Sequence, residues 1–271
     1  AAPSVAGLIM VLRLMGWLQS LEWSAFDQFF RTRPLEPIDS RIVIVGINEA
    51  DLKQVGKWPI PDEVLAKLLN KLKAQQPRAI GLDLYRDLPV EPGHQALIEV
   101  FKSTPNLIGI EKVVGGDRGF AVAPPPVLSQ KDQVGANDVL VDGDGKVRRG
   151  LLFLTPAGRD AIASLGLRLA MIYLEKEGIT PKSAQNGLLQ LGQAIFVPFE
   201  QNDGAYVRTD ARGYQMLLNF RGAAGSFRTV SMMDVLEDRV PKDWVRDRIV
   251  LVGPTAASLN DFFYTSYSGS H

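Results

Sequence analysis

RIVIVGI, residues 41–47, is the first of several short apolar runs that decide the fold. AIGLDL (79–84), NLIGIEK (106–112) and RIVLVG (248–253) are runs of the same kind. Short runs of this type, rich in β-branched residues and with no polar alternation, are typical of strands that are buried on both faces of a parallel sheet. The sequence therefore predicts a parallel sheet at the centre of the molecule.

The segments between these runs have the spacing of helices. Four leucines recur at intervals of three or four residues, at positions 65, 68, 69 and 72. We expect Asp62 to cap this helix and Pro77 to end it. Residues 94–103, 161–175 and 231–237 are predicted as further helices. Because strand–helix–strand units with short links are parallel, the expected fold class is α/β. We predict a single domain whose mixed, largely parallel central sheet is flanked by helices, plus a long N-terminal helix.

The middle of the chain carries a strong turn signal. Asp142-Gly143-Asp144-Gly145 lies between two β-rich arms, which predicts a hairpin. Asp138, Asp142 and Asp144 resemble the start of a calcium loop, but no Glu stands at the closing position, so the hairpin turn is the preferred interpretation. AIFVPF (194–199) and YQMLLNF (214–220) are predicted as strands.

Composition and charge narrow the function classes. The chain has 271 residues, with 30 Lys and Arg against 30 Asp and Glu, so its formal net charge is zero. A neutral chain has no electrostatic footprint for nucleic acid, and we expect no nucleic-acid partner. Cysteine is absent, which excludes disulfides, thiolate metal sites and cysteine nucleophiles. With His94 and His271 as the only histidines, we expect no catalytic residue, no metal site and no cofactor.

The N-terminal segment is unusually apolar. Between Val5 and Leu18, in VAGLIMVLRLMGWL, the only charge is Arg13. No run of about 20 uncharged apolar residues exists, so nothing here spans a bilayer unaided. Since the first residue is Ala, we expect an excised or processed chain, and we interpret this segment as the outer end of a membrane-anchoring helix. The alternative is a buried core helix. We expect residues 1–31 to form a membrane-proximal helix, continuous from Ser4 to Arg31, and residues 32–271 to form the α/β domain.

The same helix carries an apolar stripe. The stripe residues recur at spacings of 3, 4, 3 and 4 and are Val11, Leu14, Leu18, Leu21 and Ala25. This is the spacing of a two-stranded seam, so we predict a parallel homodimer. A second face is expected to be exposed to solvent and consists of Arg13, Gly16, Ser20, Ser24, Asp27 and Arg31. In the alternative, the stripe packs on its own domain, with Phe26, Phe29 and Phe30 sealing the contact.

Polar side chains follow the predicted strands. They are Asn48, Glu49, Asp83, Glu111 and Thr255. Since ligands of open α/β sheets bind beyond the carboxyl ends of the strands, these residues are the candidates for a ligand-binding site. Gathered acids would hold a cation or the amine of a ligand. The alternative is that each caps a helix or pairs with a base such as Arg86 or Lys112.

Five segments together resemble a known family. In chain order they are LEWSAFDQFFRTRP (21–34), RIVIVGINEADLKQVGKWPIP (41–61), PRAIGLDLYRD (77–87), VDGDGKVRRG (141–150) and RIVLVGPTAASLNDFFYTSYS (248–268). They resemble extracytoplasmic sensor domains of the second CHASE type, the cyclase/histidine-kinase-associated sensing extracellular family. The resemblance covers residues 15 to 268, and the last segment is the most specific. Ile60-Pro61-Asp62 departs from the family pattern, which more usually has an aromatic and basic pair there.

The resemblance implies a role and a location. Such domains lie outside the cytoplasmic membrane, with one transmembrane helix before them, usually three after, and a cytoplasmic cyclase or kinase module beyond. It therefore implies a periplasmic sensory input domain of a bacterial transmembrane receptor that responds to a small molecule or a physical stimulus. The family has no agreed ligand, so the resemblance transfers no catalytic residues. Two alternatives are a metal-dependent phosphohydrolase that uses the strand-end acids and an anchored periplasmic solute-binding module.

Overall fold

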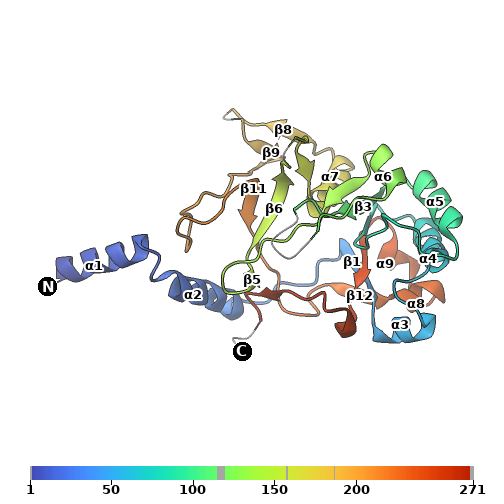
Figure 1. The fold of residues 1–271 in the computed structure, drawn as a ribbon, viewed down its shortest axis with the longest axis horizontal. Helices are drawn as coiled ribbons and strands as arrows, with labels where there is room; N and C mark the ends of the chain where they lie inside the picture. The colour runs from blue at the N-terminus through green and yellow to red at the C-terminus, as the bar shows by residue number, and fades with distance from the viewer. Residues whose placement is uncertain (1, 115–119, 157, 186, 269–271) are drawn as a thin grey trace.

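A six-stranded parallel sheet forms the centre of the structure (Figure 1). The computed structural model describes residues 2–114, 120–156, 158–185 and 187–268. The strand order is β12–β1–β13–β2–β3–β4, and every neighbouring pair is parallel. The strands are β1 (Ile42–Ile47), β2 (Ala79–Leu82), β3 (Leu107–Glu111), β4 (Val134–Ala136), β12 (Arg228–Ser231) and β13 (Ile249–Pro254). The predicted single α/β domain with a largely parallel sheet is confirmed.

Helices cover both faces of this sheet, because the side chains of its strands alternate between two apolar cores. Val250 and Val252 of β13 lie in the larger core, against α4, α5 and α8. Ile249 and Leu251 face the other way, toward α7. Helix α7 lies so close that a Cβ added to Gly81 of β2 would be 2.6 Å from one of its leucines. The helices are α3 (Glu49–Val55), α4 (Asp62–Ala74), α5 (His94–Ser103), α6 (Pro126–Gln130), α7 (Leu165–Glu175), α8 (Met232–Leu236) and α9 (Lys242–Val245), with the 3₁₀ turn η1 (Ala257–Leu259).

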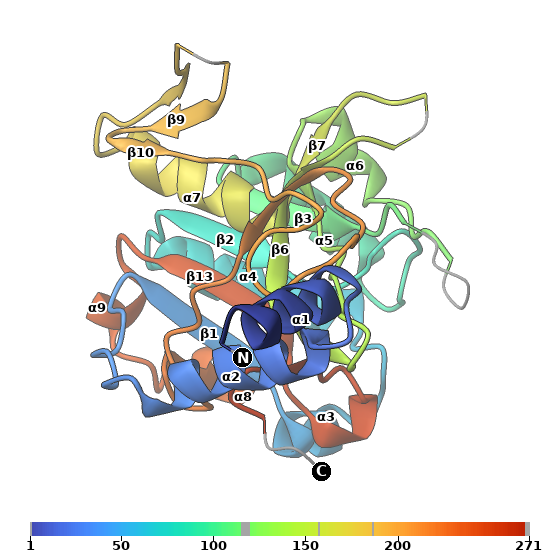
Figure 2. The same cartoon turned by 90° about the vertical axis from the view of Figure 1, so that its left-hand side faces the viewer.

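Shorter strands form a second layer beside the main sheet (Figure 2). The antiparallel strands β11–β6–β7 make one small sheet, and β10–β9–β8 make another. A parallel pair, β14–β5, joins the C-terminal segment to the middle of the chain. Their bounds are β5 (Lys146–Val147), β6 (Arg149–Leu154), β7 (Ile162–Ala163), β8 (Pro181–Ser183), β9 (Leu189–Leu191), β10 (Ala194–Ile195), β11 (Tyr214–Leu217) and β14 (Tyr264–Thr265). The runs AIFVPF and YQMLLNF thus form only short strands.

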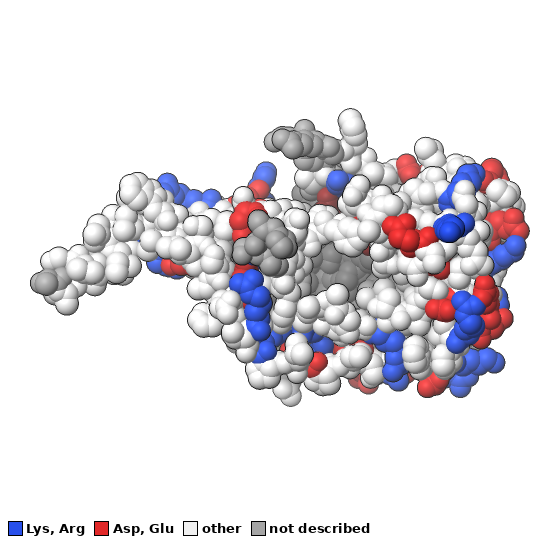
Figure 3. Space-filling view, turned by 90° about the horizontal axis from the view of Figure 1, so that it is seen from below, with Lys and Arg blue, Asp and Glu red and all other residues white. Residues whose placement is uncertain are grey.

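The N-terminal segment is two helices and not the single rod that we expected from the sequence. Helix α1 (Ala2–Leu14) and helix α2 (Gln19–Thr32) meet at 90°. The break includes Gly16, whose φ of +84° lies in the left-handed region that side chains avoid. Helix α1 projects from the body and has no buried residue, whereas α2 packs on it. Figure 3 shows α1 as an almost uncharged arm.

Asp62 does not cap α4, contrary to the expectation. Pro61 occupies the N-cap position, and Asp62 is the first helical residue. Its fully buried carboxylate lies 3.2 Å from Nε of Arg86 and 2.8 Å from Nδ1 of His94. A buried carboxylate requires charged or hydrogen-bonding partners, so this acid joins α4 to the segment between residues 86 and 94.

Candidate functional site

The predicted strand-end residues lie in a row along one edge of the sheet. Asn48 and Glu49 follow β1, Thr255 follows β13, Asp83 follows β2, and Glu111 is the last residue of β3. These four strands are consecutive neighbours in the strand order. The backbone N–H of Thr255 donates to Ile47, which ends β1, over 2.9 Å. A Cβ on Gly253 would lie 3.3 Å from the Cβ of Asp83, so β13 and β2 are also in contact here. The sequence therefore predicted correctly that these residues lie along one edge of the sheet, at the carboxyl ends of its strands.

Asn48 and Glu49, the two candidate residues after β1, are engaged in local contacts. Asn48 caps α3, because its Oδ1 accepts from the N–H of Asp51 over 3.0 Å and Asp51 accepts in return from the N–H of Asn48. Glu49 accepts from the N–H and Oγ of Ser258 at 2.7 and 3.0 Å. These contacts tie the start of α3 to η1, and they engage both Glu49 oxygens.

Asp83 and Glu111 are held differently from each other. Burial raises the pKa of Asp83, while Nδ2 of Asn137 donates to its carboxylate over 3.3 Å. Glu111 pairs with Arg159, at 3.0 and 3.3 Å, and not with Lys112. Within the described ranges, no group of three His, Cys, Asp or Glu side chains has the spacing to hold a metal ion.

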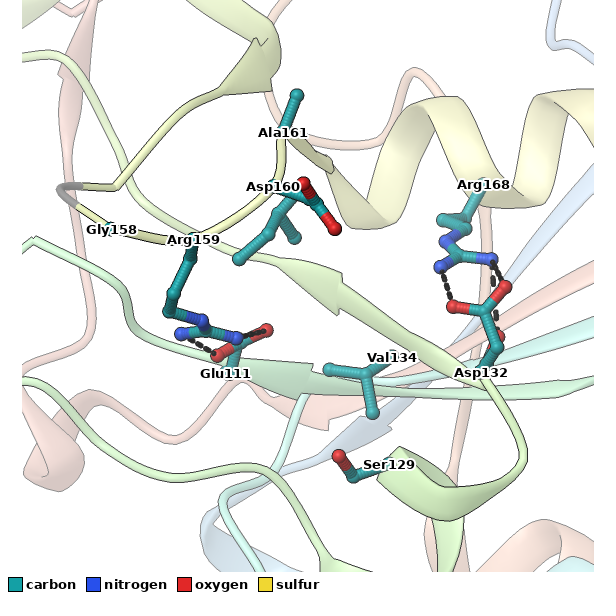
Figure 4. A pocket seen from close by; sticks show the side chains of 10 residues that line it. Glu111, Ser129, Asp132, Val134, Gly158, Arg159, Asp160, Ala161 and Arg168 are labelled. Atoms are coloured by element: carbon teal, nitrogen blue, oxygen red, sulfur yellow. Dashed lines mark hydrogen bonds and ion pairs between the residues drawn. The ribbon is translucent and has the colours of Figure 1, made fainter.

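A polar cleft of about 620 Å³ opens beside Glu111 (Figure 4). It lies between the end of β3, the α6–β4 turn, the β6–β7 loop and α7. Its charged lining residues are Glu111, Asp132, Arg159, Asp160 and Arg168. Of the strand-end residues, only Glu111 lines this cleft.

A buried ionic network lies elsewhere, where α2 meets the predicted hairpin. Arg148 is 1% exposed, and its guanidinium contacts three carboxylates. It donates to Asp27 at 2.8 and 2.9 Å, to Asp142 at 3.1 Å, and to Asp144 at 2.9 and 2.6 Å. Lys146 donates to Asp27 over 2.8 Å. A guanidinium thus lies among the three carboxylates, and the aspartates of the turn do not form a calcium loop.

The network continues into the body of the domain through Asp142. Arg149 donates to its Oδ1 at 2.8 and 3.1 Å, and the Tyr206 hydroxyl donates to its Oδ2 over 2.7 Å. Arg149 also reaches Gln215 of β11 over 2.8 Å. The turn itself is closed by a 2.8 Å bond from the N–H of Asp142 to the carbonyl of Lys146, which confirms the predicted tight turn. The hairpin therefore connects α2 to β6 and β11.

Asp27 does not lie on a solvent-exposed face of the helix. The prediction from helical spacing, which put Asp27 on the exposed face, is therefore wrong for this residue. It is 1% exposed, and α2 packs through Trp23, Asp27 and the partly buried Phe26 and Phe30. The Arg148 guanidinium lies over the Trp23 ring, with its Cζ 5.1 Å from the ring centroid. Burial by itself raises the pKa of Asp27, but hydrogen bonds from Arg148 and Lys146 outweigh it and hold that pKa at about 2.

The C-terminal segment reaches the same place. Strand β14 pairs with β5, so Tyr264 lies opposite Lys146 of the network. Ser266 is fully buried, and the ring of Tyr267 meets that of Phe30 in α2 at 6.2 Å. The N-terminal helix, the hairpin and the C-terminal segment thus converge on one buried cluster of charges. The sequence offered one signal for it, the pair Arg148-Arg149, which follows the acidic turn after two residues.

Comparison with known proteins gives one finding. The family model described as CHASE2 domain matches residues 5–271. The chain matches no curated protein and no solved structure.

We predict that Asp27→Asn lowers the free energy of unfolding by about 3–5 kcal/mol, because it leaves a buried guanidinium short of one carboxylate. The pKa of Asp27, about 2, lies below the unfolded-state value, so its charge stabilises the fold above about pH 4 and this stabilisation is lost as the pH falls toward 2. Urea unfolding between pH 7 and 2 measures both effects, and the variant should lose less stability on acidification than the wild type.

Asp210→Asn is the matched control. Asp210 also pairs with an arginine, Arg212, over 2.7 Å, but this pair is exposed to solvent, so the substitution should cost less than about 1 kcal/mol. Equal losses from the two substitutions would contradict the assignment of a special role to the buried network.

Proposed function

The chain belongs to the CHASE2 domain family, an extracellular sensory domain family of signalling receptors, and on that premise we propose that it is the periplasmic input domain of a bacterial multi-pass transmembrane receptor. A CHASE2 domain is a sensor and not a catalytic domain. We propose further that the complete protein relays the stimulus to a cytoplasmic cyclase or kinase module.

The observation that carries this proposal is the convergence of the two ends of the domain. Helix α2 and the segment of β14 meet at the buried network around Arg148. In a receptor of this topology, the chain reaches the membrane through both of these segments. Any displacement of the hairpin that holds Arg148 would therefore move both membrane connections together. This arrangement supports a relay function.

Helix α1 supports attachment to a membrane. Leu8, Met10 and Leu14 are 58%, 66% and 67% exposed, and no residue of this helix is buried, although Arg13 at its end donates to the carbonyl of Gly204 over 2.6 Å. An apolar helix without a protein partner is stabilised by lipid. In the described chain no single helix is long and apolar enough to cross a bilayer, and α1 with α2 satisfies the length and composition test only as a pair bent by 90°.

We also propose a parallel homodimer along the N-terminal helices. Leu21 is 67% exposed, Ala25 is exposed beside it, and Phe29 one turn further is 74% exposed. These residues form an uncovered stripe on α2. Since the helices are bent at Gly16, Val11 and Leu14 of α1 are not continuous with this stripe in one straight seam. The contact that we propose is therefore made by α2, with α1 diverging from it.

The relay is tested in the complete receptor in its membrane. Asp27→Asn should change the cyclic-nucleotide or phosphotransfer output about threefold or more, since about 0.7 kcal/mol in a two-state equilibrium has that effect. Asp210→Asn should leave the output unchanged. Unaltered output from Asp27→Asn, or a reading frame without a cyclase or kinase module, would contradict the proposal.

The same cells test the location. The chain has no cysteine, so Ser183→Cys on exposed β8 introduces the only thiol of the domain. A membrane-impermeant maleimide should label it in intact cells with a permeabilised outer membrane. Labelling that requires lysis would place the domain in the cytoplasm and overturn the proposal.

For the dimer, Leu21→Glu with Ala25→Glu should convert a dimer into a folded monomer, because buried like charges oppose association. Sedimentation in a detergent that shields α1 measures the mass of the particle. Ser20→Glu with Ser24→Glu, which adds the same charge on a neighbouring exposed face, is the control and should leave the dimer intact. A wild-type chain that sediments as a monomer would contradict the proposed dimer.

A further inference from the structure

The polar cleft beside Glu111 has the size of a small-molecule site. Its volume of about 620 Å³ lies within the usual range for ligand pockets, about 300–1,000 Å³. It opens at the carboxyl end of β3, on the sheet edge where α/β folds bind ligands. Its floor includes Val134 and Ser129, and its walls are charged (Figure 4).

Glu111 is the buried charge of this cleft. It ends β3 and is 5% exposed, so its carboxylate requires a cation. That cation is Arg159, which donates to both oxygens at 3.0 and 3.3 Å. The Arg159 side chain is itself 53% exposed and comes from the β6–β7 loop. A buried acid is therefore covered by an arginine that reaches it from the solvent side.

The remaining charges make the cleft anionic. Arg168 and Asp132 pair on the opposite wall, with one bond of 3.0 Å. Asp160 also lines the cleft, and among the described residues its carboxylate has no partner. Three carboxylates against two guanidinium groups leave one excess negative charge. A cation with several N–H donors matches this lining better than an anion or an apolar ligand does.

We propose that this cleft is the stimulus site and that its ligand is a small organic molecule with a primary ammonium group, which replaces the Arg159 guanidinium at Glu111. The inference rests on the proposed sensory function. An ammonium group offers three donors, so it can bind both oxygens of Glu111, as Arg159 does, with one donor left for another acceptor of the lining. The exchange keeps Glu111 paired and releases Arg159 toward solvent or toward an anionic group of the ligand.

Strand β6 connects this exchange to the buried network. It begins at Arg149, which binds Asp142, and ends at Leu154, a few residues before Arg159. A change at the loop that carries Arg159 therefore acts at one end of a short strand whose other end lies in the network. This gives the sensor a direct structural route from the ligand to α2 and β14.

Calorimetric titration of the chain with putrescine, lysine and glycine, and with succinate as the anionic control, tests the proposal. We expect an amine to bind and succinate not to bind. Glu111→Gln should weaken amine binding about tenfold or more, equivalent to about 1.4 kcal/mol, because the neutral amide cannot form the charge-assisted hydrogen bonds that the carboxylate forms with an ammonium group. Arg159→Gln should tighten it, because it removes the competing cation. Lys112→Gln, which alters a neighbouring cation that does not line the cleft, should leave the affinity unchanged.

The Arg159→Gln result separates a ligand site from a structural ion pair. In a purely structural pair, both substitutions cost stability and neither creates affinity for an amine. Thermal melting of each variant shows whether it folds, and if Glu111→Gln does not fold, Arg159→Gln still decides the question. Absence of amine binding to the folded chain, or no gain from Arg159→Gln, overturns this inference. It leaves the location and relay experiments unaffected, so the two failures are distinguishable.

Discussion

The buried guanidinium of Arg148 is the constraint on which the arrangement of the domain depends. Removing a charge from water costs several kcal/mol, and Arg148 offsets this cost only by binding Asp27, Asp142 and Asp144 at once. Asp27 belongs to α2, whereas the other two belong to the hairpin turn. Helix α2 therefore cannot leave the body without exposing or orphaning these charges. The same turn carries β5, on which the C-terminal strand β14 pairs.

The parallel sheet and the smaller antiparallel sheet have different roles in the structure. The parallel sheet has an apolar core on each face, and its carboxyl edge positions Glu111 in the polar cleft. The antiparallel strands β11–β6–β7 form a second, smaller sheet. Its strand β6 joins Arg149 in the network to the loop of Arg159. A sensory domain requires such a connection, because a stimulus at one end must alter the geometry at the other.

The sequence predicted those elements that are encoded by local patterns of apolar residues. Buried apolar runs identified β1, β2, β3 and β13, but β12 has no such run and is recognised only by its pairing with β1. The apolar N-terminal pattern continues through Gly16 and so concealed the bend. Helical spacing predicted that Asp27 lies on the solvent-exposed face of the helix. This prediction was wrong because the partner of Asp27, Arg148, lies 121 residues away, and local spacing carries no signal of so distant a contact. The strand-end edge was predictable from topology, whereas the pairing of Glu111 with Arg159, 48 residues away, was not.

A double-mutant cycle between Asp27 and Arg148 tests the central claim most directly. The free energies of unfolding of Asp27→Ala, Arg148→Ala and the double variant are compared with that of the wild type by urea denaturation. If the two side chains hold α2 on the hairpin, their coupling energy should exceed about 1 kcal/mol, with the double variant losing much less than the two single losses added together. Losses that add within about 0.3–0.5 kcal/mol would show independent side chains and contradict the claim.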